Sequence, residues 1–191
     1  MRKGLRISSG TLSGHQVDTS QLKDARPTSE RVRQSMLSII QNDLKNTCFV
    51  DAYAGSGIVG LEALSNGAEK VIFIDKNANN TRLLKKNCSI LKVIDRIKIV
   101  KGETPECFPG IRSLTDEKRM IFFFDPPYAE SQSELVMSSL RELMVHVDYG
   151  LVIWEHHHKT EIACDGEGWD MFRVERYGET QLTFLRPADS A

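Results

Sequence analysis

Short apolar runs alternate with amphipathic segments along most of the chain. Nearly continuous apolar runs predict strands at about 48–52, 70–75, 97–101, 120–125 and 150–154. Between them, apolar residues recur at helical spacing and predict helices over residues 58–66, 77–91 and 131–147. Because the strands lack a polar face, we expect an α/β fold in which helices cover both sides of a mostly parallel sheet.

Both ends of the chain depart from this pattern. Two strand-like stretches at 171–177 and 180–186 are separated by only two residues, one of them Gly178. Such a connection is typical of a hairpin and would place one antiparallel strand in the sheet. The first 27 residues lack long apolar runs and are rich in Ser, Thr and Gly. We therefore expect an amino-terminal hairpin or arm over residues 1–27 and a main domain over residues 28–191.

The arm and the first residues of the main domain are basic. Residues 1–33 hold seven Lys and Arg against three Asp and Glu, although the whole chain has a net charge of −1. A polyanion that binds near the amino terminus would explain this charge, and a basic solvated loop explains it equally well. Thr28 is the expected cap of a helix to about Gln41, with Arg31 and Arg33 away from the core. Its inward positions are apolar: Val32, Met36, Ile39 and Ile40.

The composition is typical of a soluble globular protein. With 191 residues, 40% of them hydrophobic and 27% charged, the chain suits one soluble globular domain. Cys48, Cys88, Cys107 and Cys164 are scattered, which favours reduced thiols over a zinc site or disulfides. Consecutive residues of a strand point to opposite sides, so His156–His158 predicts no chelating face. With no long apolar span and no signal peptide, we expect a cytoplasmic protein without membrane or metal.

A glycine-rich motif lies between a predicted strand and a predicted helix. Residues Gly55 to Gly60 satisfy G-x-G-x-x-G, and Asp75 ends the next strand, 20 residues beyond Gly55. Glycines permit a tight turn and let a ligand approach backbone N–H groups, while an acid on the second strand can accept ribose hydroxyls. The motif therefore predicts a nucleotide-type cofactor.

Two cofactors satisfy this motif. A dinucleotide would place its pyrophosphate on the helix N-terminus, whereas S-adenosylmethionine would lay its methionine part along the loop and its ribose on Asp75. Asp51, four residues before Gly55, favours the second, because a carboxylate repels pyrophosphate but attracts a cationic amino group. Glu103, just after the third strand, could accept hydrogens from the adenine amine.

The tetrapeptide Asp125-Pro126-Pro127-Tyr128 follows the fourth predicted strand. Its carboxylate and the Pro126 carbonyl could accept the hydrogens of a nucleobase amine and so localise the lone pair on nitrogen. Tyr128 would stack on the base, worth about 1–3 kcal/mol, after the base has been flipped out of any helix. A sulfonium methyl donor carries its own leaving group, so methyl transfer here would need no metal.

Four motifs together carry a resemblance to a known family. They are Arg26-Pro-Thr-Ser-Glu-Arg-Val-Arg, Asp51-Ala-Tyr-Ala-Gly-Ser-Gly, Gly60-Leu-Glu-Ala-Leu-Ser-Asn-Gly-Ala and Asp125-Pro-Pro-Tyr. In this order and spacing, the chain resembles the RsmD-type methyltransferases, which use S-adenosylmethionine to methylate N2 of one guanine in small-subunit (16S) ribosomal RNA. The resemblance implies a seven-stranded class I (Rossmann-like) methyltransferase fold with one antiparallel strand. It also implies ribosomal RNA as partner, either free, in a 30S precursor or in an assembled subunit.

The resemblance also implies roles for single residues. Implied contacts to the target base are Asp125, Pro126, Pro127 and Tyr128. Implied cofactor contacts are Asp51, Ala54, Gly55, Ser56, Gly57, Asp75, Lys76 and Glu103. Implied RNA contacts, from the family's basic hairpin and Arg-Pro-Thr segment, are Arg2, Lys3, Arg6, Arg26, Arg31 and Arg33.

Three other functions remain open from the sequence. The Asp-Pro-Pro-Tyr motif also serves adenine and cytosine amines, so the substrate could be DNA or another RNA. The glycine motif alone also fits a nicotinamide-dependent oxidoreductase. The basic arm would serve equally in a nucleic-acid-binding module without catalysis.

Overall fold

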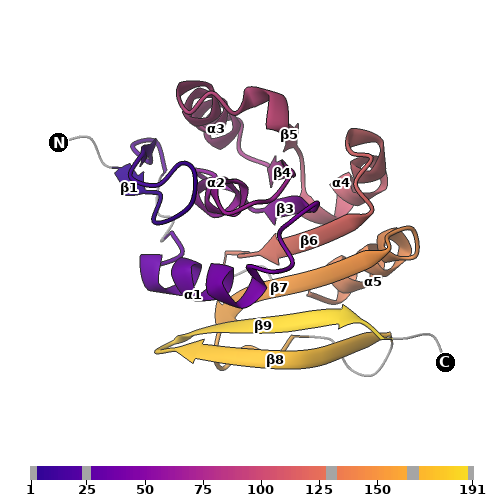
Figure 1. Cartoon of the computed structure of the whole chain (residues 1–191). Coiled ribbons are helices and arrows are strands. Elements are labelled where there is room, and N and C mark those ends of the chain that lie inside the picture. Colours follow the sequence, from indigo (N-terminus) through magenta and orange to yellow (C-terminus); the bar gives the residue numbers. More distant parts are fainter. Residues whose placement is uncertain (1–3, 23–26, 128–132, 163–167, 189–191) are drawn as a thin grey trace.

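The computed structural model describes residues 4–22, 27–127, 133–162 and 168–188. These residues form a seven-stranded sheet in the order β5-β4-β3-β6-β7-β9-β8 (Figure 1). Only β9 runs antiparallel to the other strands of this sheet. The strands are β3 (Cys48–Ala52), β4 (Lys70–Asp75), β5 (Ile97–Lys101), β6 (Arg119–Phe124), β7 (Tyr149–His157), β8 (Trp169–Tyr177) and β9 (Thr180–Pro187). The mixed α/β sheet expected from the sequence is confirmed.

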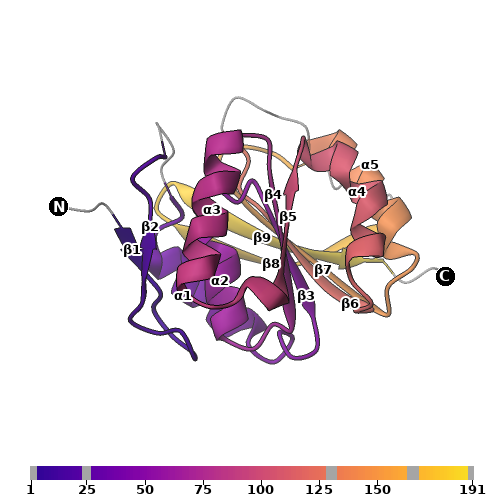
Figure 2. The ribbon, with the colours of Figure 1, turned by 90° about the horizontal axis from the view of Figure 1, so that it is seen from above.

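Helices cover both faces of the sheet. Figure 2 shows α1, α2 and α3 on one side of the strands and α4 and α5 on the other. Their bounds are α1 (Glu30–Ile40), α2 (Ile58–Ser65), α3 (Ala78–Ile90), α4 (Thr104–Ile111) and α5 (Ser133–Met144), with short 3-10 turns at Ile94–Arg96 and Arg112–Leu114. This arrangement explains the continuous apolar runs, because a strand buried on both faces has no polar side.

Two apolar clusters fill the space between the layers. Alternate residues of one strand enter different clusters: Phe49 packs with α1, α2 and α3, whereas Val50 packs with α4 and α5. On the second side, the ring of Phe108 from α4 meets the edges of Phe122 and Phe124 from β6 at centroid distances of 6.1 and 6.2 Å. The sheet is therefore anchored on both faces, and its strand ends are fixed in place.

The strand order changes direction at β3. From β3 the chain moves outward through β4 to β5, then returns to the other side of β3 as β6. In open parallel sheets, ligands bind beyond the carboxyl ends of the strands where the order reverses in this way. Asp51, Asp75 and the residues after Phe124 all lie at this edge.

A two-stranded hairpin precedes the main sheet. Its strands β1 (Gly4–Arg6) and β2 (Gln16–Asp18) pair antiparallel, and it lies beside α2 and α3 (Figure 2). Ile7 and Val17 are fully buried in the same cluster as α1, α2 and α3. Asn87 of α3 also accepts from the Asp18 N–H at 3.1 Å and donates to its carbonyl at 3.0 Å. The hairpin is thus packed onto the body of the protein.

The structure corrects two local expectations. Ser29, not Thr28, caps α1: its hydroxyl accepts from the Val32 N–H. The sequence reading also missed α4, because Pro105, Pro109 and Gly110 obscure its helical pattern. Pro105 is nevertheless accommodated in the first turn, where backbone N–H groups have no partner within the helix.

Candidate active site

The segment after β3 turns back sharply. Three of its residues have left-handed backbone angles: Tyr53 at φ 68°, Gly55 at φ 54° and Gly57 at φ 79°. A Cβ at Gly57 would also lie 2.7 Å from Leu84 Cδ1, so glycine is required there on both counts. At Gly55, a Cβ would meet only Leu22 Cδ2 at 3.8 Å, which leaves the backbone open to a ligand on that side.

Backbone hydrogen bonds hold the rest of this loop in place. The buried Ala54 donates its N–H to the Ile74 carbonyl of β4 at 3.0 Å. The Ser56 carbonyl accepts from Asn87 of α3 at 3.2 Å, and Ser56 is itself buried. The glycine loop is therefore rigidly joined to the neighbouring strand and helix.

Asp75 lies at the tip of β4, beside the loop. Its Oδ2 accepts from the Gly55 N–H at 2.9 Å and from Asn80 Nδ2 at 3.0 Å. Its Oδ1 accepts from the Asn77 N–H at 2.8 Å. These three donors fix the carboxylate at the carboxyl edge of the sheet, where the sequence places the ribose contact.

Lys76 and Glu103 extend the same edge towards β5. Glu103 directly precedes α4, just beyond the end of β5, and its Oε1 lies 3.6 Å from Lys76 Nζ. Both side chains are nearly half exposed, so this ion pair opens easily for a ligand. The structure thus brings the tips of β3, β4 and β5 together as the sequence expects for a cofactor site.

Asp51 lies beneath the glycine loop, at the end of β3. It is only 2% exposed, and its Oδ2 accepts from the Gly60 N–H of α2 at 2.9 Å. Burial raises the pKa of Asp51 to about 8, against the lowering effect of the Gly60 hydrogen bond, and the nearby Asp75 raises it further. A cation bound at this position would stabilise the ionised form.

Asp125 follows the last residue of β6, with Pro126 half-buried and Pro127 exposed beside it. Burial raises the pKa of Asp125 well above its usual range, and Glu155 and Asp51 add to this effect. Tyr128, the fourth residue of the motif, lies outside the described residues. Because Phe124 pairs with Ala52, Asp125 lies beside the start of the glycine loop, at the carboxyl edge of the sheet.

A pocket opens beside the two prolines. It lies between the end of β6, the end of β7 and the start of α5, and its residues include Trp154, His156 and Ile162. His156 is buried and uses both ring nitrogens, bonding Thr183 Oγ1 at 2.9 Å and the His157 carbonyl at 3.0 Å. Within the described ranges no group of three His, Cys, Asp or Glu could hold a metal ion.

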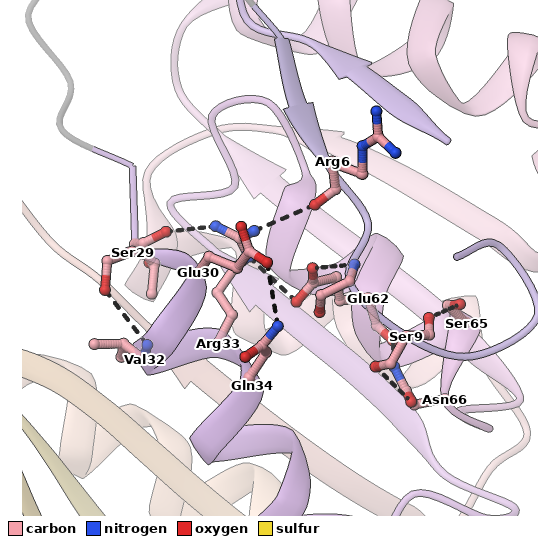
Figure 3. Close-up of polar contacts among 12 residues, drawn as sticks. Arg6, Ser9, Ser29, Glu30, Val32, Arg33, Gln34, Glu62, Ser65 and Asn66 are labelled. Carbon is pink, nitrogen blue, oxygen red and sulfur yellow. Dashed lines mark hydrogen bonds and ion pairs between the residues drawn. The ribbon is translucent and has the colours of Figure 1, made fainter. Parts of the chain in front are cut away.

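The predicted RNA contacts divide into two groups. Arg6 and Arg31 are exposed, and Arg31 lies over the ring of Tyr177 at 5.9 Å. The expectation that Arg33 points away from the core is wrong: it is 1% exposed and its Nε lies 3.2 Å from Glu62 Oε2 (Figure 3). A buried guanidinium cannot reach an RNA phosphate in this structure. Three further predicted contacts lie outside the described residues: Arg2, Lys3 and Arg26.

Three residues near the site were missed in the sequence. Thr28 and Glu155 lie beside Asp125, and Glu62 pairs with Arg33. Glu62 carried a usable signal, because it is the one acid in the apolar helix α2, whose eight residues are all buried. A buried acid in such a helix requires a cationic partner. No comparable signal marks Thr28.

The fold is that of the class I, Rossmann-like S-adenosylmethionine-dependent methyltransferases. The Escherichia coli chain yhhF has the same fold, with a TM-score of 0.82 at 21% identity over 98% of this chain and all of that chain. An RNA methyltransferase from Salinibacter ruber, solved with S-adenosyl-L-homocysteine, has a TM-score of 0.65 at 14% identity and covers 87% of this chain and 96% of that one.

The family is shown by a match over nearly the whole chain. A family model described as Conserved hypothetical protein 95 matches residues 5–186. The chain therefore belongs to this family, which is the RsmD-type family that its sequence motifs resemble. The Ribosomal RNA small subunit methyltransferase D of Escherichia coli (strain K12) is 24% identical over 175 residues, which span 92% of this chain and 86% of that protein.

Proposed function

We propose that this protein transfers a methyl group from S-adenosylmethionine to the exocyclic N2 amine of a guanine in small-subunit ribosomal RNA. The observation that carries the proposal is the Asp125 carboxylate at the end of β6, directly beside the glycine loop that follows β3. The small-subunit substrate is supported by the name of the Escherichia coli relative. Guanine N2 is the part of the proposal that rests on the RsmD-type motifs.

The residues at the strand tips suit this cofactor. Asp75 presents a fixed carboxylate to ribose hydroxyls, and Lys76 with Glu103 lies where the adenine would be held. The buried Asp51, ionised beside a cation, suits the cationic amino group of the methionine moiety. No helix in the described part of the chain is long and apolar enough to cross a membrane.

When bound, S-adenosylmethionine supplies a methyl group on a positively charged sulfur. In the proposed transfer, the N2 lone pair would form the new N–C bond as the C–S bond breaks onto sulfur, and the amine would release one proton to solvent. Asp125 and the Pro126 carbonyl accept the two amine hydrogens, which holds the lone pair on nitrogen and directs it at the methyl group. In well-oriented reactions, positioning can supply up to about 7–11 kcal/mol of the barrier reduction.

RNA would approach along the hairpin and α1. Arg6 of β1 and Arg31 of α1 are exposed and would contact phosphates, together with the basic residues that lie outside the described ranges. Such contacts fix the position of the RNA without reading its sequence. Selection of the target guanine would then depend on RNA shape and on the pocket beside Pro126.

Nucleoside mass spectrometry tests the proposal. Ribosomal RNA from cells that lack the gene should lose one N2-methylguanosine, and the purified protein with labelled S-adenosylmethionine should restore it on the RNA or on 30S particles. Asp125→Ala should abolish transfer while cofactor binding persists, whereas Asp95→Ala, a matched exposed acid in the 3-10 turn before β5, should retain activity. A methylated adenine or cytosine would overturn the guanine assignment, and binding of NAD without methyl transfer would overturn the reaction.

A further inference from the structure

Thr28 lies against the proposed reaction centre from outside the sheet. It is 4% exposed, and its hydroxyl donates to Asp125 Oδ2 at 3.4 Å, a contact between residues 97 positions apart. Because Ser29 takes the capping role in α1, the Thr28 hydroxyl is not used by the helix. It is therefore available to the carboxylate.

A buried arginine holds Thr28 in this position. Arg33 Nη1 donates to the Thr28 carbonyl at 2.7 Å, and Arg33 Nε forms the ion pair with Glu62. The same guanidinium donates through Nη2 to the Arg6 carbonyl in β1 at 3.4 Å, and Glu62 Oε1 accepts from the Ser8 N–H at 2.9 Å (Figure 3). Thr28 is thus fixed by contacts that also fasten the amino-terminal hairpin to α2.

Two carboxyl groups face the Thr28 hydroxyl. Trp154 of β7 pairs with Phe124, the last residue of β6. The residues that follow them, Glu155 and Asp125, therefore lie side by side. Glu155 is 9% exposed, and its Oε2 is buried without a hydrogen-bond partner among the described residues. Burial raises the pKa of both groups, and at Asp125 the hydrogen bond from Thr28 acts in the opposite direction. The other charges that face this pair are Asp51 of β3, which raises the pKa of Asp125, and Arg33 of α1, which lowers that of Glu155.

We propose that Thr28 is a positioning residue for methyl transfer: its hydroxyl holds Asp125 Oδ2 and leaves Oδ1 for the amine hydrogen. The inference rests on the proposed role of Asp125. A hydroxyl has a single hydrogen, so it selects one carboxylate oxygen and sets the rotation of the group. The Arg33 guanidinium that holds the Thr28 carbonyl also contacts the Arg6 carbonyl of β1, so the support of Thr28 is continuous with the hairpin.

Thr28→Val and Thr28→Ser separate the hydroxyl from the shape of the side chain. Thr28→Val keeps the volume and removes the donor, so kcat should fall about tenfold, as for the loss of a hydrogen bond to a charged group. The KM for S-adenosylmethionine should stay within about twofold. Thr28→Ser should restore most of the lost rate, since it keeps the hydroxyl.

The pH profile of kcat distinguishes a positioning role of Thr28 from a purely structural one, because only the first changes the pKa of Asp125. The ionised Asp125 carboxylate is the stronger acceptor of amine hydrogens, so the rate should fall as pH drops through its pKa. Loss of the Thr28 hydrogen bond raises this pKa, so Thr28→Val should move the acid limb to higher pH. Glu155→Gln removes the neighbouring negative charge, lowers the pKa of Asp125, and should move the limb to lower pH.

The outcomes distinguish this inference from the proposed function. A wild-type kcat and an unmoved acid limb in Thr28→Val would overturn the role of Thr28, as would equal losses in Thr28→Val and Thr28→Ser. If Thr28→Val fails to fold, Thr28→Ala removes the same hydroxyl, and a wild-type kcat with an unmoved acid limb in that variant overturns the inference. An active Asp125→Ala would overturn the proposed role of Asp125 itself.

Discussion

Removal of the buried Arg33 guanidinium should destabilise the fold severely. Arg33 and Glu62 are 1% and 0% exposed, and Arg33 also donates to two backbone carbonyls. Loss of one partner from a buried ion pair costs about 3–5 kcal/mol, because the other charge stays buried without compensation. In a domain of this size each kcal/mol lowers Tm by about 2–4 °C. Arg33→Met should therefore lower Tm by about 6–20 °C.

Thermal unfolding followed by circular dichroism measures this effect. Arg31→Met, two positions earlier on the exposed side of α1, is the matched control and should shift Tm by no more than about 2–4 °C. The double variant Arg33→Met/Glu62→Met replaces both charges by apolar groups and should be more stable than either single variant. An Arg33→Met protein that melts within about 2 °C of the wild type would show that the pair contributes little to the fold.

Three further predictions concern the site. Asp75→Ala should raise the Kd of S-adenosylmethionine about 10–100-fold in calorimetry, and an unchanged Kd would refute the ribose contact. A cofactor cation beside Asp51 would lower its pKa from about 8, so affinity should weaken as pH falls below that value. Asp51→Asn should flatten this dependence, and equal pH curves for both proteins would exclude Asp51 as the partner. Arg6→Ala and Arg31→Ala should each reduce the slope of log K against log salt for RNA by about 0.7–0.9, and an unaltered slope would remove that residue from the phosphate contacts.

The central strands could be predicted because they are buried on both faces. The runs at 48–52 and 70–75 coincide with β3 and β4, since a strand without a polar face leaves a continuous apolar signal. The edge strand β5 is only partly buried, yet it also matches the predicted run at 97–101. Parallel strands end at the same edge of a sheet, so the sequence also predicts Asp75 and Asp125 at one edge. The strands and the sheet edge could be predicted because they depend on local sequence pattern and on general rules of chain connection.

The contacts of Arg33 could not be predicted in the same way. A basic residue in an amphipathic helix is usually solvated, and nothing near Arg33 in the sequence marks it as buried. Its partner Glu62 lies in α2, and the carbonyl of Arg6 lies in β1, so its environment exists only after three separate segments have packed. The sequence predicts a helix cap at Thr28 because the partner of its hydroxyl, Asp125, is 97 residues away and cannot be recognised locally.

The hairpin's distant contacts also constrain the order of folding. Ser8 and Leu12 bond to residues of α2 that lie 54 and 53 positions later, and Asp18 bonds to Asn87, 69 positions later. On a ribosome the hairpin is synthesised first, yet its docking surface is incomplete until α3 has emerged. Contacts across such separations form after local ones, because the loop must first be closed. We infer that the hairpin docks late, so that the Arg33 contacts and the Thr28 bond to Asp125 are among the last to form.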